Sequence, residues 1–169
     1  MWGGVILHEL KQRFNSPTVN LFFSARDYLT FLSDLHRFLS LDIVEMQTTN
    51  PYPVGDLGGL TVNFMHYRSF DEAKNKWIER TKRINFENLY VMMVQGSDCT
   101  DQMVEEFDKL PYSKKVIFVG KPYPNIQSAV CIQGTALKDG SVIDLCQYKS
   151  KYTGKRFIDD FDYVSFLNS

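Results

Sequence analysis

The sequence predicts an α/β protein, a three-layer sandwich with a mixed, mostly parallel sheet and helices on both faces. First, residues 61–94 show the pattern of a strand, a helix and a strand, which is typical of a crossover unit in a parallel sheet. Second, the nearly continuous apolar runs at residues 89–94 and 116–119 indicate strands that are covered on both faces. Because no linker or internal repeat interrupts the sequence, we expect a single α/β domain over residues 1–169.

The strand–helix–strand segment carries the clearest local signals. Residues 61–67 are β-rich and alternate between apolar and polar side chains. Ser69 and Glu72 form a capping box at the start of the next helix, whose apolar residues then recur at helical spacing. Arg80 and Arg83 belong to a basic stripe at the edge of that apolar face. This stripe is either a solvated helix surface or a set of guanidinium groups that bind phosphate.

The same patterns predict the other elements in chain order. The expected helices are residues 5–14, a segment that begins after Ser24 and continues to Leu39, residues 100–110 and residues 156–167. The expected strands are residues 18–23, 43–46, 128–132 and 141–145. Residues 48–59 are dense in proline and glycine, so we expect a mobile loop or a plain connection there.

Composition and charge restrict the classes of function. A hydrophobic content of 44% and an aromatic content of 14% predict a globular protein. The net charge of −1 and the pI of about 6.3 argue against a non-specific nucleic-acid binder, which would normally be basic. The three cysteines show no CxxC spacing, so we expect neither structural zinc nor a disulfide framework, and we expect a cytoplasmic location. No apolar run approaches the ~20 residues of a membrane span, and no signal-peptide pattern is present.

Polar residues that follow the two apolar runs are candidate ligand groups. Asp98 lies in a turn after residues 89–94, and Lys121 follows residues 116–119. Ligands of open α/β sheets bind outside the carboxyl ends of the strands. Asp98 is therefore a candidate base or metal ligand, or alternatively a helix cap, and Lys121 is a candidate anion-binding residue. Neither a dinucleotide-binding fingerprint nor a P-loop is present, so the cofactor stays unknown and no residue is assigned to a metal site.

Several motifs follow one another along nearly the whole chain: Trp2-Gly3-Gly4, Asn15-Ser16-Pro17-Thr18, Tyr52-Pro53-Val54-Gly55, Phe64-Met65-His66-Tyr67, Arg83-Ile84-Asn85 and Leu110-Pro111-Tyr112. Together they resemble a bacterial family of unknown function that carries the label exopolysaccharide biosynthesis protein. Members of that family usually begin with an extra strand that ends in Asn-Asn-Cys directly before Trp-Gly-Gly. Met1 stands where that cysteine would be, so we expect this chain to lack the strand and a nucleophile or polar ligand group.

The resemblance implies a role in exopolysaccharide or capsule biosynthesis, for which we consider three activities. The first is sugar transfer from a nucleotide sugar or a sugar phosphate, with Arg80, Arg83 and Lys121 neutralising phosphate and Asp98 acting as base. The second is acyl transfer or hydrolysis on a polysaccharide with His66 as base, although no GxSxG nucleophile motif is present. The third is a non-catalytic subunit or scaffold of the polysaccharide assembly machinery.

The predicted site combines the residues of these hypotheses. The catalytic candidates are His66 and Asp98, and the substrate-binding candidates are Asn15, Ser16, Arg80, Arg83, Asn85 and Lys121. For the acyl-transfer hypothesis, Ser16 and Ser69 are candidate nucleophiles. The expected partner is a carbohydrate or nucleotide-sugar substrate, without nucleic acid and without a transmembrane segment. Association with membrane-bound polysaccharide assembly proteins stays open.

Overall fold

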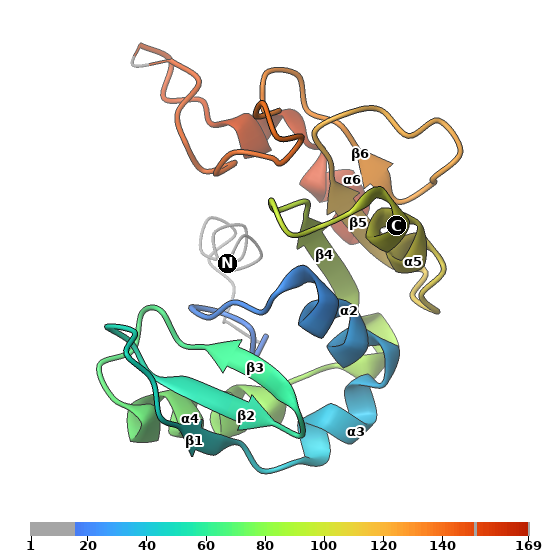
Figure 1. The fold of residues 1–169 in the computed structure, drawn as a ribbon. Coiled ribbons are helices and arrows are strands. Elements are labelled where there is room, and N and C mark those ends of the chain that lie inside the picture. Colours follow the sequence, from blue (N-terminus) through green and yellow to red (C-terminus); the bar gives the residue numbers. More distant parts are fainter. Residues whose placement is uncertain (1–15, 151, 169) are drawn as a thin grey trace. The chain divides into compact units, whose positions relative to one another are not determined.

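The computed structural model describes residues 16–150 and 152–168 (Figure 1). The helix expected over residues 5–14 and the candidate residue Asn15 lie outside these described residues. The chain divides into two compact units, of which the first ends at Glu87 and the second begins at Asn88. That the two units fold and unfold as a single domain stays a prediction. In the described part of the chain, no helix has the length and apolar character needed to span a membrane.

The first unit contains an antiparallel sheet, with strands β1 (Val44–Met46), β2 (Val54–Leu57) and β3 (Leu60–Asn63) in the order β1-β2-β3. Its described α-helices are α2 (Ala25–Ser33), α3 (Leu35–Ser40) and α4 (Phe70–Thr81). The turn between β2 and β3 contains Gly58 and Gly59, whose φ angles are 61° and 94°. Glycine adopts such positive φ angles at little cost, so this pair lets β3 fold back directly onto β2.

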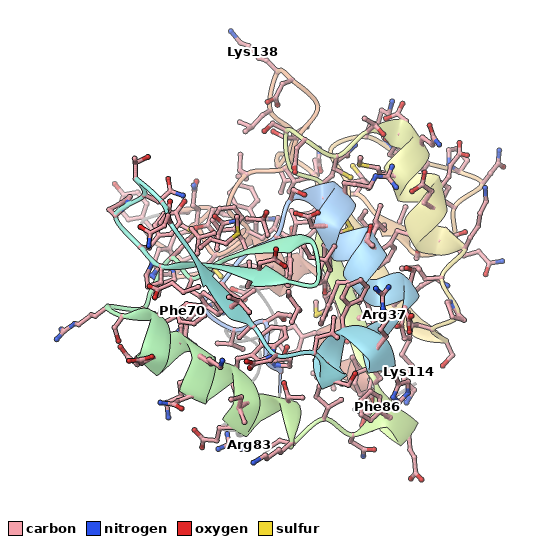
Figure 2. The ribbon with its side chains drawn as sticks, turned by 60° about the horizontal axis from the view of Figure 1, so that its bottom comes forward. Arg37, Phe70, Arg83, Phe86, Lys114 and Lys138 are labelled. Carbon is pink, nitrogen blue, oxygen red and sulfur yellow. The ribbon has the colours of Figure 1, made fainter. Side chains whose placement is uncertain are left out.

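Aromatic side chains form much of the core of the first unit. Helix α4 begins after Ser69, as the capping box predicts, and buries the apolar face that carries Phe70 and Trp77. Trp77 packs on Phe31 of α2 with ring centroids 6.0 Å apart, and Phe31 stacks on Phe23 at 5.2 Å. Figure 2 shows Phe70 between α4 and the antiparallel sheet. The predicted helix over this segment is therefore confirmed, together with its buried face.

Two predictions for the first unit are wrong. Residues 54–57, expected within a loop, form strand β2, where Gly55 provides room for packing. A Cβ atom at Gly55 would lie 2.8 Å from the side chain of Ile43, so glycine is required here by close contact. Residues 18–23, expected as a strand, form turns and one antiparallel bridge from Phe22 to Asn63. Asn20 has a φ of 66°, which is incompatible with extended backbone.

The second unit contains a parallel sheet, with strands β4 (Tyr90–Val94), β5 (Lys114–Phe118) and β6 (Ala129–Val130) in the order β4-β5-β6. Its described helices are α5 (Asp101–Asp108), the 3-10 helix η2 (Phe157–Asp160) and α6 (Tyr163–Asn168), while the 3-10 helix η1 (Phe86–Asn88) spans the boundary between the units. Helix α5 packs against β5, and Phe161 packs edge-on against Phe118 with centroids 5.1 Å apart. The two apolar runs are therefore strands, as predicted.

The α/β class is confirmed, but a three-layer sandwich with one mixed, mostly parallel sheet is not. The described strands form one antiparallel and one parallel sheet of three strands each. Strand β3 pairs with β2 while β4 pairs with β5, so residues 61–94 do not form a crossover unit within one sheet. The glycine turn before β3 explains this difference, because it allows an antiparallel partner that is adjacent in sequence.

Candidate functional site

Polar residues gather at the carboxyl ends of β4 and β5 in the second unit. The register pairs Val94 of β4 with Phe118 of β5, so the segments that follow both strands leave the same edge of the sheet. Gln95 directly follows β4, and Gly120 and Lys121 come shortly after β5. This is the edge at which open α/β sheets bind ligands.

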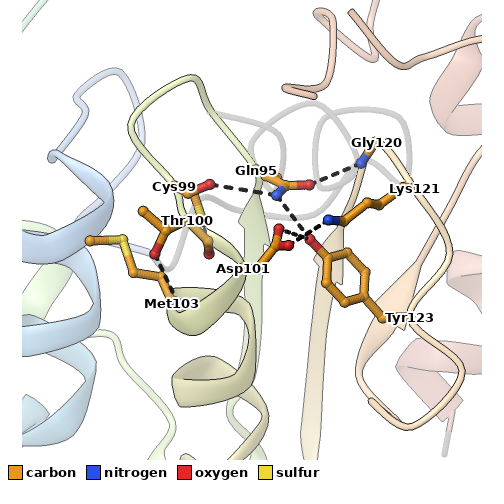
Figure 3. A network of polar contacts seen from close by, with 8 residues as sticks. All are labelled: Gln95, Cys99, Thr100, Asp101, Met103, Gly120, Lys121 and Tyr123. Atoms are coloured by element: carbon orange, nitrogen blue, oxygen red, sulfur yellow. Dashed lines mark hydrogen bonds and ion pairs between the residues drawn. The ribbon is translucent and has the colours of Figure 1, made fainter. Parts of the chain in front are cut away.

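The Gln95 side chain forms hydrogen bonds with residues that follow both strands (Figure 3). Its side chain amide Nε2 donates to the hydroxyl of Tyr123 at 3.3 Å and to the carbonyl oxygen of Cys99 at 3.5 Å. Its Oε1 accepts from the backbone N–H of Gly120 at 3.0 Å. Gln95 is only 5% exposed, and a buried amide with these partners has little freedom to move. The segment after β5 is therefore held in a defined position beside the end of β4.

Asp101 receives two hydrogen bonds from this segment (Figure 3). Lys121 Nζ donates to Oδ2 at 2.5 Å, and the Tyr123 hydroxyl donates to Oδ1 at 2.5 Å. Asp101 is the first residue of α5, where the helix dipole favours a negative charge, and Thr100 caps this helix by accepting from the N–H of Met103. The side chains of Lys121 and Asp101 are 57% and 60% exposed, so a ligand can reach both groups from solvent.

The electrostatics of this group follow from its hydrogen bonds. The bonds from Lys121 and then from Tyr123 lower the pKa of Asp101, and the bond to Asp101 raises the pKa of Lys121. Burial, followed by the bond to the Asp101 carboxylate, raises the pKa of Tyr123. At neutral pH the site therefore holds a carboxylate, an ammonium and a neutral phenol. An incoming anion would compete with the Asp101 carboxylate for the two donors.

A turn over residues 136–142 packs against the same strand ends. Leu137 donates its N–H to the carbonyl of Ser141, and the N–H of Val142 donates to the carbonyl of Gln95 at 2.9 Å. A Cβ atom at Gly120 would lie 2.3 Å from the carbonyl oxygen of Gly140, so only glycine fits at this approach. The turn thus covers part of the edge that carries Lys121.

Asp98 and Lys121 are the two predicted residues that the structure brings to one edge. Asp98 is exposed after β4, and its Oδ1 would lie 2.9 Å from a Cβ atom at Gly96, so the carboxylate folds over that glycine. The N-cap of α5 is Thr100, which resolves the capping alternative that was open for Asp98. Gln95 and Asp101 are not among the predicted site residues, although Gln95 is a polar residue directly after an apolar run.

The predicted phosphate-binding arginines have internal partners in the first unit. Arg80 is 9% exposed, and its Nη1 donates to the carbonyl of Val19 at 3.0 Å and to the hydroxyl of Tyr67 at 2.7 Å. These contacts give Arg80 a structural role, since they connect α4 to the segment before α2. Arg83 forms an ion pair with Glu79 and is partly exposed just beyond α4 (Figure 2). Phosphate binding by either arginine stays a prediction.

The remaining candidates of the first unit lie on or near its surface. His66 is exposed in a turn after β3. Ser16 Oγ lies 2.8 Å from Thr18 Oγ1, and Ser69 Oγ accepts from the N–H of Glu72 at 3.3 Å, so both serine hydroxyls have local partners. The predicted set is thus divided between the units: Ser16, His66, Arg80, Arg83 and Asn85 belong to the first, and Asp98 and Lys121 to the second.

Comparison with known proteins gives a family for this chain. The family model described as a domain of unknown function (DUF1919) matches residues 1–168. An uncharacterized protein of Haemophilus influenzae is 43% identical over 166 residues, which cover 98% of this chain and 80% of that protein. Neither description names an activity, a substrate or a polysaccharide.

Proposed function

The chain belongs to the DUF1919 family, and we propose that it binds a nucleotide sugar or a sugar phosphate at the carboxyl edge of its parallel sheet. In this proposal it carries out a sugar-transfer step of exopolysaccharide or capsule biosynthesis in the cytoplasm. The polysaccharide process comes from the family resemblance of the sequence motifs. The observation that supports ligand binding is the Gln95-centred network, which holds a solvent-accessible lysine at the ends of two parallel strands.

The network supplies donors that suit a phosphate group. Lys121 and Tyr123 already hold one anion, the carboxylate of Asp101, with two short hydrogen bonds. A phosphate or diphosphate carries more charge and more acceptor oxygens than a carboxylate, so it can replace Asp101 as the partner of these donors. Asp101 would then remain favourably placed at the N-terminus of α5.

The proposed reaction assigns separate roles to Lys121 and Asp98. An acceptor hydroxyl forms a new C–O bond at the anomeric carbon while the bond from that carbon to the phosphate oxygen breaks. The charge that develops on the departing phosphate is stabilised by Lys121. The proton of the acceptor hydroxyl passes to the exposed carboxylate of Asp98. Both residues follow strands that end at the same edge, as this division of roles requires.

A thermal-shift screen tests the binding step. The full chain is measured with nucleoside diphosphates, nucleotide sugars and a sugar 1-phosphate, each with and without Mg²⁺ or Mn²⁺. A ligand at about 100 times its Kd stabilises the folded state by about 2.7 kcal/mol, which is readily detected. We expect stabilisation that is lost in Lys121→Gln and kept in Lys109→Gln, a control at the exposed C-cap of α5.

Two results would count against the proposal. One is the absence of stabilisation by every phosphorylated ligand. The other is equal stabilisation of Lys121→Gln and Lys109→Gln, which would place the ligand away from the strand ends. If a ligand is found, Asp98→Asn should retain binding while the release of nucleoside diphosphate in the presence of acceptor sugars is lost. Retained turnover in this variant would remove Asp98 from the mechanism.

A further inference from the structure

Strand β1 presents an open edge in the first unit. It is the outer strand of its sheet and pairs only with β2 among the described strands. All three of its residues are exposed, including the apolar side chains of Val44 and Met46, which are 61% and 38% exposed. The outward backbone N–H and C=O groups of such a strand can pair with another extended segment.

The opposite edge of the same sheet is already occupied. Asn63 of β3 exchanges two backbone hydrogen bonds with Phe22, at 2.9 Å and 3.0 Å. The two edges therefore differ, because in the described part of the chain only the β3 edge has an additional backbone partner, through the isolated bridge at Phe22. A new strand would join this sheet at β1.

A groove with acidic walls lies beside β1. The groove has a volume of about 480 Å³ and is lined by Leu41, Asp42, Val44, Glu45, Met46, Asp56 and Gly58. The register pairs Val44 with Asp56 and Glu45 with Gly55, so Asp56 lies on the sheet face of Val44 and Met46, and Glu45 lies on the opposite face. Among the described residues, its lining includes three carboxylates and no cationic side chain. Asp42 forms an ion pair with Lys74, and Glu45 is the acidic residue of β1 itself, the strand whose edge is open.

We propose that β1 binds an extended segment of a partner protein in which one basic residue stands between two apolar residues. Directly opposed residues of neighbouring strands share a face, so a lysine or arginine would lie opposite Glu45. The flanking apolar residues would lie opposite Val44 and Met46 and cover their exposed side chains. A second copy of this chain fits less well, because antiparallel pairing centred on Glu45 would oppose like charges.

Synthetic peptides and a charge reversal test this proposal. The probes are fluorescently labelled Ser-Thr-Val-Lys-Val-Thr-Ser and the matched peptide with Glu in place of Lys, whose symmetry allows either strand direction. By fluorescence anisotropy, the full chain should bind the lysine peptide about three- to tenfold more tightly than the glutamate peptide. Glu45→Lys should reverse this preference, while Glu87→Lys, an exposed change outside the groove, should leave it unchanged.

Hydrogen exchange supplies an independent measurement. The outward amides of residues 44–46 should exchange rapidly in the free protein and become protected when the lysine peptide is added. The proposal is overturned if neither peptide binds, or if both bind equally to the unmodified chain and to Glu45→Lys. It is also overturned if these amides are protected in the free protein, or if sedimentation shows a dimer that Glu45→Lys alters.

Discussion

Replacement of Arg80 by methionine distinguishes a structural role from the phosphate-binding role that the sequence predicts. The guanidinium group is buried and donates to Val19 and Tyr67, which lie 61 and 13 residues away in the sequence. If Arg80 has this structural role, Arg80→Met destabilises the fold. If Arg80 instead served mainly to bind ligand, its removal would leave stability nearly unchanged, because a binding residue makes few internal contacts.

The expected decrease in the free energy of unfolding follows from these two hydrogen bonds. Methionine keeps much of the apolar stem of arginine, so the main loss is the pair of bonds from a charged donor. Bonds of this kind contribute about 1.5–3 kcal/mol each, and Tyr67 can still donate to Val19 after the change. We therefore expect Arg80→Met to lower the free energy of unfolding by about 2–4 kcal/mol. For a chain of this size, that loss corresponds to a fall in Tm of roughly 5–15 °C.

The assay is urea unfolding followed by circular dichroism, with Lys76→Met as the matched control. Lys76 lies on the same helix, is exposed and pairs with Glu79, so its replacement should cost at most about 0.5 kcal/mol. Tyr67→Phe should also destabilise the chain, and its effect should not add fully to that of Arg80→Met because the two side chains share a hydrogen bond. A loss in Arg80→Met no larger than that in Lys76→Met would refute the structural assignment.

For three other substitutions, a single contact determines the expected change in stability. Thr81→Val should raise the free energy of unfolding by up to about 1 kcal/mol in urea, because the buried Thr81 hydroxyl has no hydrogen-bond partner among the described residues. Gly120→Ala should lower the free energy of unfolding by about 1–3 kcal/mol, since the new Cβ would meet the carbonyl of Gly140. An unchanged free energy of unfolding would contradict this contact. The hydrogen bond from Lys121 lowers the pKa of Asp101. The ionised Asp101 side chain therefore stabilises the folded state above its ordinary pKa of 3.8, and this stabilisation is lost as the pH falls through the lower pKa of Asp101 in the folded state. Asp101→Asn should therefore weaken the acid dependence of Tm.

Helix starts could be predicted because their causes are local. Ser24, Ser69 and Thr100 each accept a hydrogen bond from the backbone N–H three residues later, at the starts of α2, α4 and α5. The expected helix after Ser24 is nevertheless divided at Asp34, whose φ and ψ of −143° and 58° lie outside the helical region. The apolar stripe continues across this break, so periodicity alone could not reveal it.

Sheet membership could not be predicted because it depends on partners. Strand β2 contains Gly55, and a glycine in sequence usually indicates a loop. Here glycine is required because the Ile43 side chain packs against this position. Likewise, Arg80 occupies the edge of an amphipathic helix, where a basic residue is usually solvated. Its burial depends on the carbonyl of Val19, a contact across 61 residues that no local pattern encodes.

The candidate site was predicted in part. Asp98 and Lys121 could be identified because each follows an apolar run, and the parallel register brings those runs to a common edge. The role of Gln95 depends on its bonds to Gly120 and Tyr123, which are 25 and 28 residues away. The sequence around a polar residue in a turn does not indicate such distant partners, so the role of Gln95 in the site could not be predicted.

The proposed ligand site is tested most directly by an amide chemical-shift titration of the full, ¹⁵N-labelled chain with a nucleotide sugar. We expect the largest changes at the amides of Gly96, Gly120 and Lys121, which lie at the carboxyl ends of β4 and β5. The same titration of Lys121→Gln should show these changes strongly reduced. Changes confined to the first unit, or no changes at saturating ligand, would contradict the assignment of this edge as the ligand site.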